Sequence, residues 1–205
     1  MTGIVAQNVG RTSGLVKAAS GGGGVWTLIK TVTASSDSTI DFVDGTSDVV
    51  LDSTYPIYVF KFINIHPADA TAFTFQANVA GASGFNETIT STYFHPSNQE
   101  SGGVQGLNYN EDQDKAQDTT FQRIGIAGND NDSNIGGELK IFSPSSTTFV
   151  KHWMSVTVQN NGVTLQQEFG AGYFNTTSAV DEIQFKMSSG NIDAGKIKLY
   201  GLSDS

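Results

Sequence analysis

Apolar and polar residues alternate with a period of two along most of this chain, a pattern that is typical of β-strands. Helical periodicity is almost absent. The clearest strand patterns cover residues 25–34, 39–43, 56–65, 73–79, 138–142, 149–158, 163–169, 182–188 and 196–202. Shorter ones cover 93–94 and 119–126. Strands separated by turns about every 8–12 residues predict an all-β protein, an antiparallel β-sandwich with a jelly-roll-like arrangement.

Three of these segments carry more specific expectations. Residues 56–65 are apolar at both alternating sets of positions, which predicts a central strand with both faces buried. Residues 73–79 alternate aromatic with polar side chains, which predicts one buried face and one face in water. The turn-forming residues 191–195 predict a hairpin that pairs 182–188 with 196–202.

Four consecutive glycines, residues 21–24, divide the chain. We interpret residues 1–24 as an N-terminal attachment arm with a Gly-rich linker, and residues 25–203 as a single sandwich domain. Within that domain the strand pattern weakens over 82–134, which predicts a long loop-rich insertion. Glycine has the most backbone entropy to lose on ordering, and chain ends fray unless something holds them. We therefore expect another molecule to hold the arm.

Composition narrows the classes of function. The 205 residues carry a formal net charge of −9 and contain no cysteine, which excludes disulfides and thiolate chemistry. An acidic chain is a poor ligand for nucleic acid, which attracts clustered Lys and Arg. The sequence has no apolar run of membrane-spanning length and no secretory pattern at its start. We expect synthesis in a cytoplasm and no membrane or nucleic-acid partner.

Motifs for catalysis are weak. The sequence has neither a Gly-x-Ser-x-Gly elbow nor a phosphate-binding Gly-Lys-Ser/Thr loop. Glu111, Asp112 and Asp114 could supply the carboxylate pair of a glycosidase, but their clustering in a Gln-containing polar segment favours solvated side chains. The histidines share no metal-ligand spacing, and two of them, His66 and His95, precede proline, which predicts turns. We conclude that the protein is not an enzyme and needs no cofactor for catalysis.

One segment resembles a calcium-binding loop. Asp130, Asp132 and Asn134 offer oxygen atoms at alternate positions, as calcium loops do. Ile135 stands where an EF-hand requires glycine, and Ile141 stands where it requires glutamate. These three residues are the candidate Ca²⁺ ligands, and the alternative is a solvated turn.

Two tyrosines are candidates for ligand binding. Tyr93 and Tyr109 lie in the segment with the weak pattern, whereas most other aromatic residues lie in strand patterns that favour the core. If they bind a glycan, both should be exposed.

The arm sets small and apolar residues around two cations, which suits an extended strand laid on an acidic or edge-exposed partner surface. The candidate attachment residues are Ile4, Val5, Arg11, Leu15, Val16 and Lys17.

Several segments resemble small virion structural proteins of marine tailed bacteriophages. They are Gly3-Ile4-Val5, residues 10–16, Leu51-Asp52-Ser53-Thr54-Tyr55, Ile65-His66-Pro67, Phe73-Thr74-Phe75-Gln76, and residues 183–193 and 196–201. The resemblance spans most of the chain except 82–134. It implies a component of a phage particle and brings no catalytic residues with it.

These observations together predict a bacteriophage virion structural protein, either a capsid decoration or a head-fibre protein, that stabilises the shell. Its expected location is the virion, assembled in the host cytoplasm. Its expected partners are the major capsid protein or other virion proteins, and copies of itself, with a homotrimer favoured. The first alternative is a tail fibre or receptor-binding protein that recognises host surface glycan. The second is a glycan-cleaving enzyme, which requires two carboxylates about 5–9.5 Å apart across a groove.

Overall fold

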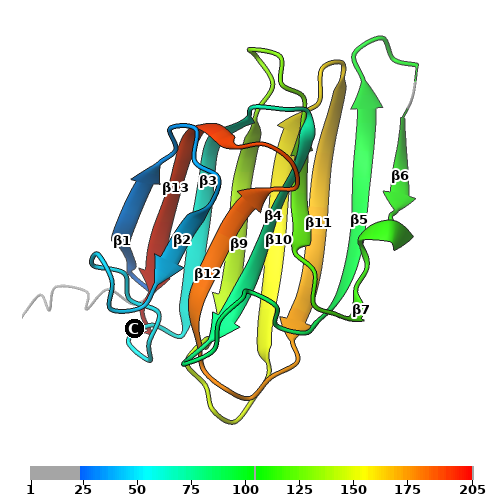
Figure 1. Ribbon diagram of the computed structural model, residues 1–205. Helices are drawn as coiled ribbons and strands as arrows, with labels where there is room; N and C mark the ends of the chain where they lie inside the picture. Colours follow the sequence, from blue (N-terminus) through cyan, green and yellow to red (C-terminus); the bar gives the residue numbers. More distant parts are fainter. Residues whose placement is uncertain (1–23, 104, 205) are drawn as a thin grey trace, which may run out of the picture.

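The structure, a computed structural model, describes residues 24–103 and 105–204. These residues form two antiparallel β-sheets packed face to face (Figure 1). The predicted all-β antiparallel sandwich is therefore confirmed, whereas the jelly-roll connectivity stays a prediction. The glycine run up to residue 23 and the preceding arm lie outside the described residues.

The two sheets differ in width. The large sheet runs, in spatial order, β1 (Trp26–Thr33), β13 (Ile192–Leu202), β3 (Ile57–Pro67), β9 (Ile135–Phe142), β10 (Lys151–Asn160), β11 (Thr164–Phe174), β5 (Ile89–Gln99) and β6 (Gln105–Tyr109), with β7 (Ala116–Asp118) also paired to β5. The small sheet runs β2 (Ile40–Val43), β12 (Val180–Met187), β4 (Thr71–Val79) and β8 (Gln122–Ala127). A 3-10 turn, η1 (Glu111–Gln113), follows β6. No helix in the described ranges has the length and apolar character of a membrane span.

Aromatic side chains fill the space between the sheets. The ring of Phe185, on β12, is fully buried and lies 5.1 Å from Phe60 and 5.4 Å from Phe62, centroid to centroid. Phe73 stacks on it at 5.7 Å from the neighbouring strand β4. Most of these rings meet edge to face, an arrangement that adds to the gain from burying their area. The packing of Phe185 therefore ties the small sheet to the large one.

The predicted hairpin between 182–188 and 196–202 is wrong. β12 belongs to the small sheet, where it pairs with β2 and β4, and β13 belongs to the large sheet between β1 and β3. Both strands point apolar residues into one core, so their alternation is the same as it would be in a hairpin. The pattern alone could not distinguish strands that pair from strands that face one another.

Residues 82–134 are not a loop-rich insertion. They contain β5, β6, β7 and β8, and most residues of β5 pair with β11 inside the large sheet. Polar residues such as Thr90 and Asn98 weaken the apolar pattern of β5.

The two His-Pro pairs do not form turns. His66-Pro67 ends β3, and His95-Pro96 lies inside β5. The ladder between β5 and β11 has no recorded pairs between Ser97 and Phe94, beside the proline that lacks an N–H to donate.

The polar face of β4 is not in water. Thr74, Gln76 and Asn78 are all buried. The Gln76 side-chain amide donates hydrogen bonds to the carbonyl oxygens of Glu87 at 3.0 Å and Thr119 at 3.1 Å. Two connecting segments therefore cover this face and satisfy the Gln76 amide, which period-two alternation does not reveal.

Phe185→Ala should lower the free energy of unfolding by about 3–5 kcal/mol, because it leaves a cavity where several rings meet. Urea denaturation measures this change. Phe149→Ala is the control, since Phe149 is 72% exposed, and it should shift stability by about 0.5 kcal/mol or less. A loss below about 1 kcal/mol for Phe185→Ala would contradict the central position of this ring.

Candidate functional site

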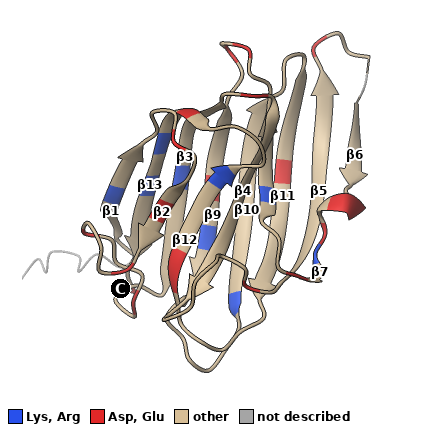
Figure 2. Cartoon of the chain, in the orientation of Figure 1, with Lys and Arg blue, Asp and Glu red and all other residues tan. Residues whose placement is uncertain are grey.

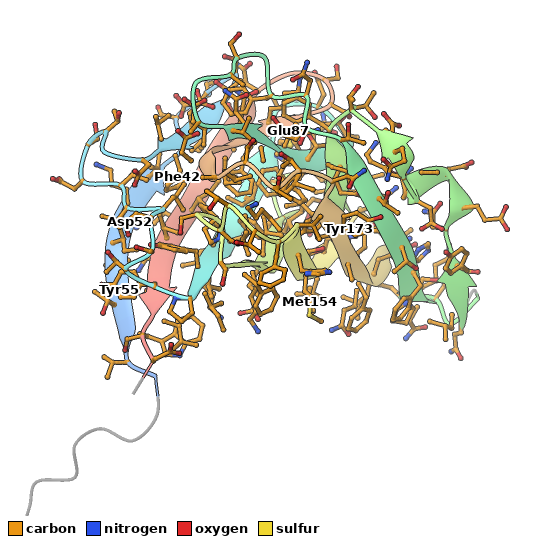
Figure 3. The ribbon with its side chains drawn as sticks, turned by 90° about the horizontal axis from the view of Figure 1, so that it is seen from below. Phe42, Asp52, Tyr55, Glu87, Met154 and Tyr173 are labelled. Carbon is orange, nitrogen blue, oxygen red and sulfur yellow. The ribbon has the colours of Figure 1, made fainter. Side chains whose placement is uncertain are left out.

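The large sheet turns one face toward the small sheet and the other away from it. Figure 3, which looks from below, shows Phe42 on the side of the small sheet and Met154 on the opposite side. In β10 the buried residues Trp153, Ser155 and Thr157 alternate with Met154 and the other outward positions. Because side chains alternate along a strand, the register of neighbouring strands fixes which residues share this outer face.

Four neighbouring strands contribute one half of the outer face, which we call the uncharged half-face. Its outward positions are His152, Met154, Val156, Val158 and Asn160 on β10; Leu165, Gln167, Phe169, Ala171 and Tyr173 on β11; Thr90, Thr92, Phe94, Pro96 and Asn98 on β5; and Gln105, Leu107 and Tyr109 on β6.

The uncharged half-face contains no Asp, Glu, Lys or Arg. The charged residues of its four strands are Lys151 and Glu168, and both are buried on the inner side. The other half of the outer face differs, because β13, β3 and β9 carry basic residues (Figure 2), and the register of these strands puts several of them on the outer face. Its charged positions are Lys61, Glu138, Lys140, Lys196 and Lys198. Charge is therefore segregated across one continuous sheet.

The uncharged half-face is also strongly apolar. Its exposed large side chains are Phe94, Leu107, Tyr109, Met154, Val158 and Leu165. Single exposed apolar residues are ordinary on a protein surface, but a contiguous group of this size marks an interaction site.

A hollow of about 450 Å³ lies in this half-face. Ala171 forms part of its lining between the larger neighbours Phe169 and Tyr173 on the same strand, with Met154 and Thr92 on the flanking strands. A second hollow of about 200 Å³ shares Ala171, Met154 and Thr92 with the first. The two hollows therefore adjoin along β11.

Beneath the hollow, Trp153 packs across its register partner Gly172. A Cβ at Gly172 would lie 2.6 Å from the Trp153 ring and 2.5 Å from the Thr90 carbonyl oxygen, so only glycine fits.

Aromatic pairs border the hollows on the outside. Phe94 and Phe169 stack at 4.9 Å, and His152 meets Tyr173 edge to face at 6.0 Å.

Some polar groups around the hollow already have partners within the chain, whereas the buried indole N–H of Trp153 has none among the described residues. Thr90 Oγ1 accepts a hydrogen bond from Gln117 Nε2 at 2.6 Å, and Thr92 Oγ1 lies 3.3 Å from the Tyr109 hydroxyl. That hydroxyl also donates to the Asp114 carboxylate. A sugar site needs polar groups that are free to face the ligand, whereas an apolar lining suits side chains of a protein.

The structure separates the two tyrosines that the sequence singled out. Tyr109 is 59% exposed on the uncharged half-face. Tyr93 is fully buried on the inner side of β5, so its expected exposure is wrong. Alternation along β5 puts Tyr93 and Phe94 on opposite faces, and the exposed residue of the two is Phe94.

Tyr93 belongs to a buried polar cluster. Its hydroxyl donates to the Glu168 carboxylate, which also pairs with Arg123 from β8. The register of β5 and β11 places His95 opposite Glu168. Burial raises the pKa of Glu168 to about 8, and the guanidinium of Arg123 opposes this rise. Burial, and then the charge of Arg123, lower the pKa of His95.

The remaining candidates lie elsewhere. Asp130 and Asp132 are exposed in the turn between β8 and β9, where Asn134 Nδ2 donates to the Asp132 carbonyl oxygen at 3.3 Å. No group of three His, Cys, Asp or Glu residues suited to a metal ion occurs in the part of the chain that the structure describes. Calcium binding stays a prediction.

The attachment residues of the arm, from Ile4 to Lys17, lie outside the described residues.

No protein-family model matches this chain, and no curated protein matches it.

Sequence reasoning did not find the uncharged half-face. The sequence of β10 does indicate this surface. Its outward residues Met154, Val156 and Val158 are apolar, as is the inward residue Trp153. The same pattern in 56–65 predicted burial on both faces, yet Ile63 is exposed on the outer face of β3. Apolar residues on both faces of a strand therefore indicate that both faces are covered, but they do not identify what covers the outer face.

Arg123→Leu leaves the buried Glu168 carboxyl without its counterion. In the unfolded chain this carboxyl has a pKa of about 4.3, whereas burial raises the folded pKa to about 8 in the unmodified chain, and loss of the Arg123 charge raises it further. Between these values the folded variant holds a proton that the unfolded chain has lost. Its free energy of unfolding should therefore fall as pH rises through this window, by up to about 1.4 kcal/mol per pH unit.

Urea denaturation across this pH range measures the slope. The variant Arg123→Leu, Glu168→Leu lacks the titrating carboxyl and serves as the control, so it should lack this slope. Equal slopes in the single and double variants would show that Glu168 is not the group responsible.

Proposed function

We propose that this protein is a non-enzymatic structural subunit of a tailed-bacteriophage particle, either a capsid decoration or a head-fibre protein. The observation that carries the structural role is the uncharged half-face, a broad apolar surface on a rigid sheet. Surfaces of this kind serve association between proteins, and charge depletion is typical of the core of an interface. The assignment to a phage particle is supported by the sequence resemblance.

In this proposal residues 1–24 anchor the protein to the major capsid protein or to another virion protein. The sandwich stands outside the shell and binds neighbouring subunits through its apolar face. Each contact contributes about 25 cal/mol per Å² of apolar surface buried. Repetition over a particle multiplies the effect, because a tethered subunit meets its neighbour at high effective concentration.

The glycan-binding alternative has less support. Of its two candidate tyrosines, only Tyr109 is exposed, and its hydroxyl is bonded to Asp114. The hydroxyl groups of Thr90 and Thr92 beside the hollow are also engaged within the chain. A receptor-binding protein would instead need free polar groups beside its aromatic platform.

Deleting residues 1–20 should leave the sandwich folded and abolish attachment to particles. The deletion ends before β1, so the melting temperature should stay within a few degrees of that of the full chain. Immunogold labelling with an antibody against the sandwich should place the full chain over phage heads and find no truncated protein there.

Two results would count against this assignment. Truncated protein that still decorates particles would refute the anchoring role of the arm. Gold confined to tails would refute the placement on the capsid and favour an adhesin.

A further inference from the structure

We propose that a second copy of this chain covers the uncharged half-face. This inference rests on the proposed structural role, because it names the surface through which subunits associate. It deepens that role by stating which residues meet and what kind of molecule they meet. Size, charge and shape each support a second copy as the occupant.

The area is that of a specific protein interface. The six exposed large apolar residues of the half-face present roughly 100 Å² each, about half of what a large aromatic side chain can bury. Partly exposed Val156, Phe169 and Tyr173 add to them. The total approaches the roughly 800 Å² per partner of a standard interface, and it exceeds the apolar patch of about 300–600 Å² found on typical monomers.

The charge distribution favours self-association. When a surface packs on a copy of itself, charges near the two-fold axis meet their own kind, and the uncharged half-face has no Asp, Glu, Lys or Arg to repel its counterpart. The neighbouring half of the sheet would bring Lys61, Lys140 and Lys198 toward the same lysines of the second copy. A nucleic acid, an anionic membrane or a strongly charged protein would find no complementary charge on the uncharged half-face.

The shape of the half-face allows it to fit a second copy of itself, because it has both protruding side chains and a hollow. Leu107 and Tyr109 are prominently exposed on β6, at the edge of the sheet. The hollow beside Ala171 lies two strands away on β11. In a contact between copies, the β6 side chains of one copy can fill the hollow of the other, and the exchange is reciprocal about a two-fold axis.

Met154→Asp tests the proposal. Met154 lines both hollows, is 51% exposed, and has Lys140 as its register partner, so a carboxylate is tolerated in the single subunit. Sedimentation velocity of the full chain from about 1 to about 100 µM should show a dimer. Met154→Asp should weaken the association at least about 100-fold, because the contact buries the introduced charge.

Leu28→Asp is the matched control. Leu28 is 50% exposed on the same outer face, but on β1 in the other half. The Leu28→Asp variant should associate as strongly as the unmodified chain. Leu107→Asp on the edge strand β6 is a second test variant if Met154→Asp does not fold, and melting curves establish folding for each protein.

Three outcomes would overturn the proposal. They are a monomeric full chain at the highest concentration, an assembly that survives both Met154→Asp and Leu107→Asp, and an assembly that Leu28→Asp dissociates as strongly. Because the free protein is measured, the result is separate from attachment to particles. A dimer that never binds phage would refute the particle role and leave the self-association intact.

Discussion

The packing of aromatic rings between two sheets of unequal width governs this structure. Phe185 and its neighbours hold the four-stranded sheet against the middle of a nine-stranded one. The small sheet ends at β8, which lies over β10, since the Ile124 carbonyl oxygen on β8 accepts a hydrogen bond from Thr157 on β10. Toward β5, strand β8 makes a polar contact, in which Ser91 donates to Gln122. At that boundary the cluster of Arg123, Glu168 and Tyr93 closes the interior with ion-pair and hydrogen-bond contacts instead. The polar cluster is therefore a consequence of the mismatch in width.

The same large sheet carries the functional argument on its other side. Its inward residues pack in the core between the two sheets, so its outward residues are available to contact another molecule. Ion pairs of Glu138 with Lys61 and Lys140 mark one half, and an apolar, uncharged surface marks the other. Glycine at position 172 lets Trp153 lie flat beneath the second half, so that interior packing and the outer hollow are built from the same strands.

Structural features that depend on short stretches of chain could be predicted from the sequence, whereas features that depend on residues far apart in the chain could not. The alternation of apolar and polar residues predicted the all-β fold class and strands such as β3 and β10. The separation of β12 from β13 did not, because both strands point apolar residues into one core. Tyr93 was taken for a surface residue because the apolar pattern of β5 is weak, and its partner Glu168 lies far along the sequence. The uncharged half-face escaped for a related reason, since alternation identifies two apolar faces without telling which one the chain itself covers.

Oxidation of Met154 measures most directly whether the outer face is covered. Met154 is half exposed in the single subunit, whereas Met187 is buried in the core and serves as the internal reference. Peroxide treatment followed by mass spectrometry, over a range of protein concentrations, reports the accessibility of both sulfur atoms. The account expects oxidation of Met154 to slow toward the rate of Met187 as concentration rises. Rapid oxidation of Met154 at every concentration would contradict it.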